Sequence, residues 1–149
     1  MIFNLFKNND KNNDSDENIN LLKIVALLIH AAKIDENYTE REKKIINDFV
    51  NISLKNKKNE YVLNFVKKAE VYESNSNQIL EYTKEVKKMD IDSKKLILKT
   101  LWKIILSDNS SDVYESNLMR RICGLLYIPD KLSGEIKSAI LNSEKKWHI

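Results

Sequence analysis

The chain has little of what interrupts helices, since its 149 residues include only two glycines and one proline. Tight turns and β-hairpins draw heavily on these two residues, so their scarcity disfavours an all-β fold. Charged residues make up 32% of the sequence, and leucine and isoleucine are frequent. This composition is typical of helices joined by short loops. The length is close to that of the commonest protein domains, so we expect a single domain.

The chain also has few cysteines and no long apolar run. Cys123 is the only cysteine, which rules out an intramolecular disulfide and a thiolate metal cage. The segment Met1–Phe6 is too short for the apolar core of a signal peptide, and it has no basic leader. The longest apolar run, Ile24–Ile29, is far shorter than a membrane span. We therefore expect a soluble cytoplasmic protein with no membrane span.

The charge is not concentrated as it usually is in nucleic-acid-binding proteins. The net charge is +3, and the basic residues are scattered along the chain. Pairs such as Lys67–Lys68 and Lys94–Lys95 are interpreted as solvated helix faces. The basic stretches at 55–58 and 120–121 lack interleaved exposed aromatic residues for base stacking. No nucleic-acid partner is expected.

Apolar residues recur at helical spacing over most of the chain and predict an all-α bundle of about seven helices. The expected helices cover about 20–34, 40–54, 59–73, 77–89, 93–106, 113–126 and 130–142. The first and fifth are apolar nearly all round, which places them at the centre of the bundle. Residues 1–18 are expected to form a flexible N-terminal tether, because 7–18 are almost wholly polar. The helical domain is expected over 19–143, followed by a C-terminal tail at 144–149.

A short acidic pattern occurs twice in the sequence. Asp35 and Glu42 are seven residues apart, as are Asp108 and Glu115, and the two copies are offset by 73 residues. At the same offset, the apolar residues of the first helix coincide with those of the fifth, and those of the second with those of the sixth. The pattern predicts two pseudo-symmetric halves, each with carboxylates at a helix–loop–helix junction.

Two interpretations of these acidic residues are open. Glu42 with Thr39, and Glu115 with Asp112, have the spacing of helix N-terminal capping boxes, which requires no ligand. Asp35 and Asp108 instead follow a helix end, where the helix dipole disfavours negative charge. The alternative is that each Asp–Glu pair supplies oxygen ligands to Ca²⁺ or Mg²⁺. An EF-hand is excluded, because its glycine and bidentate glutamate positions hold other residues in both copies.

The two stretches Ile34-Asp-Glu-Asn-Tyr-Thr-Glu-Arg-Glu42 and Ser107-Asp-Asn-Ser-Ser-Asp-Val-Tyr-Glu115 resemble the repeated Ala-Asp-Gly-x-x-x-x-x-Glu signature of TerB-like proteins. The Leu101–Trp102 pair and the basic apolar stretch 118–126 resemble a bacterial branch of the same superfamily. Where the signature has glycine after aspartate, this chain has Glu36 and Asn109. The resemblance covers roughly 20–143. It implies a pseudo-symmetric bundle of about seven helices, a link to tellurite resistance and stress responses, and divalent-metal binding through Asp35, Glu42, Asp108 and Glu115.

The sequence does not predict an enzyme. His30 lies within an apolar helix, and Cys123 occupies a small core position. No P-loop, dinucleotide fingerprint or HExxH motif is present. We expect a non-enzymatic TerB-like domain that binds divalent metal in a stress or tellurite-resistance context. The alternative is a metal-independent adaptor that binds a protein partner through Met1–Phe6 or a surface groove.

Overall fold

The computed structural model describes residues 14–34, 37–55, 57–76, 79–84, 86–108 and 113–146, with the side chains of 14–18, 108, 113–115 and 144–146 left out. All secondary structure within these ranges is helical, which confirms the predicted all-α bundle of seven α-helices. Two short 3₁₀ segments, η2 and η3, accompany them. The elements are α1 (Asp14–Ala32), α2 (Glu40–Leu54), α3 (Asn59–Asn75), α4 (Ile79–Thr83), η2 (Val86–Lys88), α5 (Ile91–Ile105), η3 (Leu106–Asp108), α6 (Val113–Leu126) and α7 (Asp130–Lys146).

The predicted spans of α2 and α6 are confirmed. The predictions for the N-terminal tether, the C-terminal tail and the fourth helix need correction. Helix α1 begins at Asp14, so residues 14–18 of the expected tether are helical. Helix α7 continues to Lys146, through half of the expected C-terminal tail. Apolar periodicity misses such extensions, because these residues continue a helix without adding to the apolar face. The N-terminal segment Met1–Phe6 lies outside the described residues.

The expected fourth helix is divided into α4 and the 3₁₀ segment η2. Its buried residues are Ile79, Tyr82, Thr83 and Val86, which have the i, i+3, i+4, i+7 spacing of a helix. An α-helical turn followed by a 3₁₀ turn presents nearly the same face as a continuous helix. The periodicity therefore identified the buried face correctly, although it did not show the break.

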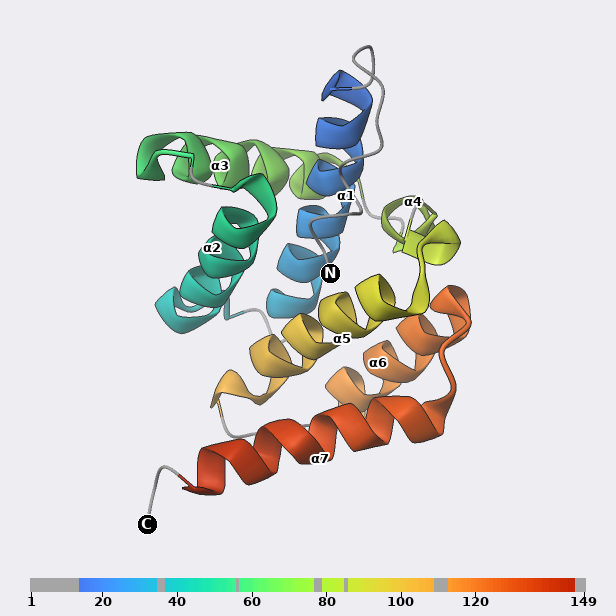
Figure 1. Cartoon of the computed structure of the whole chain (residues 1–149). Coiled ribbons are helices and arrows are strands. Elements are labelled where there is room, and N and C mark those ends of the chain that lie inside the picture. Colours follow the sequence, from blue (N-terminus) through green and yellow to red (C-terminus); the bar gives the residue numbers. More distant parts are fainter. Residues whose placement is uncertain are drawn as a thin grey trace.

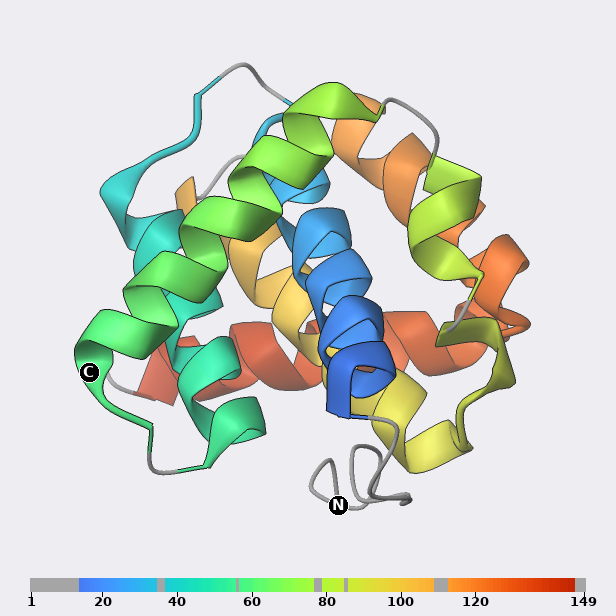
Figure 2. The same ribbon diagram turned by 90° about the horizontal axis from the view of Figure 1, so that it is seen from above.

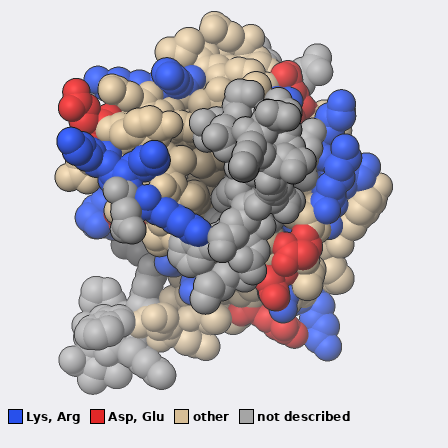
Figure 3. All heavy atoms as spheres, turned by 45° about the horizontal axis from the view of Figure 1, so that its top comes forward, with Lys and Arg blue, Asp and Glu red and all other residues tan. Residues whose placement is uncertain are grey.

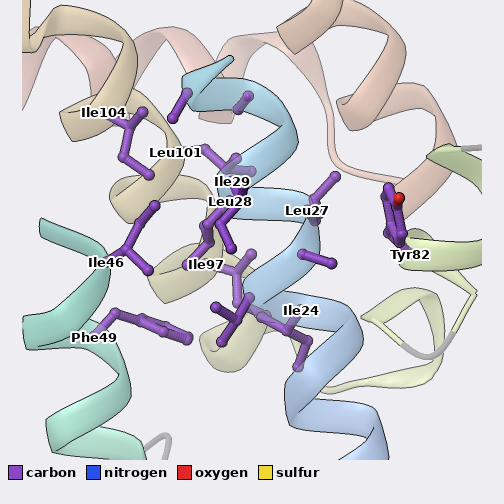
Figure 4. Close-up of a cluster of buried hydrophobic side chains, with 14 of the residues drawn as sticks. Ile24, Leu27, Leu28, Ile29, Ile46, Phe49, Tyr82, Ile97, Leu101 and Ile104 are labelled. Carbon is purple, nitrogen blue, oxygen red and sulfur yellow. The ribbon is translucent and has the colours of Figure 1, made fainter. Parts of the chain in front are cut away.

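Helix α1 is the centre of the fold. It packs against α2, α3, α4 and α5, which surround it in the view from above (Figure 2). Every residue from Ile24 to Ile29 is fully buried, as predicted from its apolar character. Figure 4 shows its side chains packing among residues from three other helices: Ile46 and Phe49 of α2, Tyr82 of α4, and Ile97, Leu101 and Ile104 of α5.

The helix boundaries reproduce the predicted offset between the halves. Helix α1 ends at Ala32 and α5 at Ile105, while α2 begins at Glu40 and α6 at Val113, so both boundaries differ by 73 residues. Packing follows the same scheme, because α1 packs closely on α3 and α5 on α7 (Figure 1). Each half thus contributes three α-helices with matching boundaries, and α4 and η2 connect the halves along the chain.

Candidate functional site

Glu42 is the one member of the predicted acidic set whose side chain the structure describes. It lies in the first turn of α2 and is 4% exposed. Its Oε1 accepts hydrogen bonds from the Thr39 amide at 2.8 Å and from the Thr39 hydroxyl at 3.0 Å. The Glu42 amide donates in return to Thr39 Oγ1 at 3.2 Å. This reciprocal arrangement confirms the predicted capping box at Thr39–Glu42.

The other members of the acidic set fall outside the described part of the molecule. Asp35 and Asp112 are not described, and Asp108 and Glu115 are placed in η3 and α6 by their backbone alone. Among the residues whose side chains are described, no group of three or more His, Cys, Asp or Glu side chains is arranged to hold a metal ion. The predicted second capping box and the Ca²⁺ or Mg²⁺ site remain predictions.

Tyr38, between α1 and α2, is hydrogen-bonded to a carboxylate of α3. Its hydroxyl donates to Glu70 Oε2 on α3 at 2.9 Å. Burial raises the pKa of Tyr38, and the carboxylates of Glu70, Glu42 and Glu73 raise it further because they disfavour the phenolate. Tyr38 thus joins the start of α2 to α3 through Glu70.

Glu73 is buried on α3 and is held by basic side chains of α1. Lys33 Nζ donates to Glu73 Oε1 at 2.7 Å, and His30 Nδ1 lies 3.4 Å from Glu73 Oε2. His30 is half-buried and has Glu73 as its partner. These contacts link α1 to the C-terminal part of α3 and explain both His30 and Lys33 without a catalytic role.

A groove lies between α2, α5 and α7, and the sequence did not reveal it. It has a volume of about 960 Å³. Helix α5 lies between α2 and α7 and packs against both (Figure 1). At one end Arg41 of α2 donates from its guanidinium to the carbonyl oxygen of Ser107 at 2.5 Å, which ties the start of α2 to η3, directly after α5.

The groove combines a basic rim with an apolar floor. Its described lining includes four cationic side chains and one anionic side chain, namely Arg41, Lys95, Lys99, Lys103 and Asp92. Beneath them the apolar lining residues are buried or half-buried, and they belong to the edge of the core: Ile45, Leu96, Leu106, Ile136 and Ile140. On the face seen in Figure 3, the basic side chains lie in separate groups on opposite sides of the view, with acidic side chains beside them.

The sequence contained a signal for this groove that was interpreted too simply. Lys95, Lys99 and Lys103 recur every four residues and therefore lie along one strip of α5. Lys95 was predicted to be solvated together with Lys94, and Lys95 is indeed exposed. The prediction for Lys94 is wrong, because this side chain is buried and its Nζ donates to the carbonyl oxygen of Leu126 at 2.9 Å. Lys94 thus satisfies the C-terminal end of α6 from a neighbouring helix.

The family assignment agrees with this architecture. The family model "Tellurite resistance protein TerB" matches residues 21–138. This match covers most of the chain and includes α2 to α6 entirely, so the protein belongs to the TerB family. No curated protein and no solved structure gives a significant match.

None of the helices in the described ranges combines the length and apolar character needed to cross a bilayer.

Proposed function

We propose that the protein is a non-enzymatic TerB-like binding module that recognises a protein partner through the groove between α2, α5 and α7. The observation that carries this proposal is the groove itself, where an apolar floor lies beneath exposed cationic side chains. Apolar surface surrounded by polar residues is the usual character of an interaction site. We place this role in the cytoplasm and in tellurite resistance or stress; the family description supports the link to tellurite resistance.

The surroundings of the reactive side chains support a non-enzymatic role. Cys123 is 1% exposed, and burial raises the pKa of its thiol, which disfavours the nucleophilic thiolate. His30 is paired with Glu73 across the α1–α3 contact. Both side chains serve the packing of helices, and neither lines the groove.

Site-specific photocrosslinking in cells tests the proposal. Ala139 is an exposed groove residue on α7, whereas Val71 is exposed on α3 and does not line the groove. A photoreactive amino acid at 139 is expected to give discrete protein adducts, and the same amino acid at 71 is the matched control. Equal labelling from both positions, or none from 139, would count against a protein-binding groove.

Divalent-metal binding at the acidic junctions is a second proposal, with Ca²⁺ or Mg²⁺ as the ion. It is supported by the repeated acidic pattern, in which Asp35 and Glu42 recur as Asp108 and Glu115 at an offset of 73 residues. Carboxylate oxygens are the ligands these ions prefer. We propose Asp35, Glu42, Asp108 and Glu115 as the ligands, with the capping role of Glu42 retained through Oε1.

Calorimetry with Ca²⁺ and with Mg²⁺ tests this second proposal on three proteins. The wild type should bind the ion and melt at a higher temperature as its concentration rises, because the ion stabilises only the folded state. Asp35→Asn/Asp108→Asn should lose the effect. Glu42→Gln removes the carboxylate but keeps an oxygen acceptor for the capping box. A loss of metal binding in this variant therefore cannot be attributed to loss of the cap. Identical titrations for wild type and both variants would rule the metal site out.

A further inference from the structure

We propose that the groove receives an acidic amphipathic α-helix of a partner protein, laid alongside α5. This inference rests on the proposed protein-binding function and adds the chemistry of the partner. It follows from the spacing of the basic side chains, the apolar floor beneath them and the types of side chain in the lining.

The basic side chains of α5 form a regular row. Lys95, Lys99 and Lys103 are four residues apart, so successive lysines are separated by about 6 Å along the helix axis. Carboxylates at positions i, i+4 and i+8 of a second helix have the same spacing. A helix running beside α5 can therefore place one carboxylate opposite each lysine, with Arg41 across the groove adding a fourth cation.

The floor requires an apolar stripe on the same partner. Ile45 of α2, Leu96 of α5 and Ile136 of α7 are half-buried, and each lines the groove. A partner that carries only carboxylates would leave this apolar surface in water, whereas an amphipathic helix covers it while its carboxylates meet the rim. Grooves that bind helices in this way contact apolar side chains spaced three or four positions apart on the bound helix.

The types of residue in the lining favour a protein helix over a nucleic acid. No aromatic side chain is present among the described lining residues, so the groove offers no platform for stacking bases. Asp92 also lines the groove at the N-terminal end of α5. Its charge would repel a continuous row of phosphates. A bound helix avoids this repulsion if the residue opposite Asp92 is uncharged or basic.

The groove also sets the length of the bound helix. From Asp92 to Lys103 its lining follows α5 over eleven residue steps, which corresponds to about 16 Å or three helical turns. The cationic residues Arg41 and Lys103 lie toward the C-terminal end of α5, and Asp92 lies at the other end. This charge gradient defines one preferred orientation for the partner.

The test is a fluorescence-anisotropy titration of the full chain against labelled synthetic peptides. The probe is a peptide of about four turns with glutamates at i, i+4 and i+8 beside a leucine stripe. One control peptide has the same composition in an order that destroys the stripe, and another has lysine in place of each glutamate. The acidic amphipathic peptide is expected to bind with clearly higher affinity than both controls.

Variants of the protein locate the binding. Lys95→Gln/Lys99→Gln/Lys103→Gln should weaken binding on the order of tenfold, since each exposed ion pair contributes modestly. The control Lys67→Gln/Lys68→Gln/Lys88→Gln removes the same charge from exposed sites outside the groove and should change affinity less than about twofold. Leu96→Ser should also weaken binding, because it makes the floor polar. Circular dichroism confirms that each variant is folded.

Three results would overturn the inference. These are equal binding of the acidic and scrambled peptides, equal losses in the two triple-lysine variants, and displacement of the peptide by oleate at lower concentrations than by unlabelled peptide. The last result would identify the groove as a site for an apolar anion.

Protein adducts from position 139 without binding of the acidic helix would leave the protein-binding function standing and reject only this partner. Peptide binding without such adducts would reject the proposed cellular function and keep the chemistry of the groove.

Discussion

Single residues at helix ends set much of the local structure of this protein. Thr39 and Glu42 satisfy each other's backbone amides at the start of α2, where the first amides of a helix have no partners within the helix. Across the α3–α4 connection, the hydroxyls of Tyr72 and Ser76 donate to the carboxylate of Glu81. Both arrangements lead to predictions about stability.

Loss of the capping box should destabilise the protein measurably. Thr39→Ala removes the hydroxyl that accepts from the Glu42 amide, so the free energy of unfolding should fall by about 1 kcal/mol. Glu42→Gln should cost less than Glu42→Ala, because the amide oxygen of glutamine still accepts from the Thr39 amide. Urea denaturation measures both effects. Asn51→Ala, an exposed substitution in the same helix, is the control, and a Thr39→Ala variant no less stable than this control would contradict the role of the cap.

The Tyr72–Glu81 hydrogen bond should make stability depend on acidic pH. The Tyr72 hydroxyl donates to Glu81 Oε1 at 2.5 Å, and this bond, followed by that from Ser76, lowers the pKa of Glu81. A carboxylate with a lowered pKa stabilises the fold above its unfolded-state pKa, and that contribution is lost as the pH falls through the folded-state pKa. The ordinary pKa of glutamate is 4.5, so wild type should exceed Tyr72→Phe in stability at pH 7 and lose that advantage as the pH falls below about 4.5.

Denaturation of both proteins from pH 7 to pH 3 measures the effect. The matched control is Tyr61→Phe, because the Tyr61 ring lies near Lys57 Nζ rather than a carboxylate. A stability difference between wild type and Tyr72→Phe that stayed constant over this range would show that the tyrosine does not lower the pKa of Glu81.

At the scale of elements, the end of α6 shows how one helix is completed by another. The Ile128 amide donates to the Cys123 carbonyl and the Tyr127 amide to the Gly124 carbonyl, which is the Schellman arrangement. Lys94 from α5 satisfies a further carbonyl, that of Leu126. The motif requires a left-handed residue, and Tyr127 takes that position with φ of 58°.

Glycine should therefore suit position 127 better than alanine. A left-handed conformation costs a residue with a Cβ about 1–2 kcal/mol, and glycine avoids that cost. Tyr127→Gly and Tyr127→Ala both lose the ring that lies 4.8 Å from Lys87 Nζ, so the comparison isolates the backbone effect. We expect the glycine variant to be more stable than the alanine variant by about 1 kcal/mol in thermal or urea denaturation. An alanine variant of equal stability would mean that the α6–α7 turn changes its conformation.

For the whole molecule, the central helices of the two halves form one core. Leu28 of α1 is fully buried near α5, where Ile97 and Leu101 are also fully buried (Figure 4). Neither half can bury its central helix alone, because α1 is covered by α5 as well as by α2 and α3. Folding of the two halves should therefore be coupled.

Leu28→Ala should destabilise the whole protein in a single transition. Truncation of a fully buried leucine typically costs about 2–5 kcal/mol through lost burial and a residual cavity. Far-UV and near-UV circular dichroism followed during urea denaturation should give coincident midpoints, both shifted equally by the substitution. Two separated transitions, with one half unaffected, would show that the halves fold independently.

The sequence by itself determined the features that depend on neighbouring residues. The spans of α2 and α6, the capping box at Thr39 and the 73-residue offset follow from helical periodicity and side-chain–backbone hydrogen bonding, which act within a few residues. The burial of α1 was also predictable, since a helix that is apolar all round has to lie inside the fold.

Only the tertiary structure decided the features in which distant segments meet. The groove exists because α5 packs between the start of α2 and the C-terminal half of α7, and no local pattern specifies which helices become neighbours. For the same reason Lys94 and Lys95, adjacent in sequence and similar in chemistry, have different surroundings. Lys94 faces the open carbonyl of α6 and is buried, whereas Lys95 faces the groove and stays exposed, because consecutive residues of a helix point in directions about 100° apart.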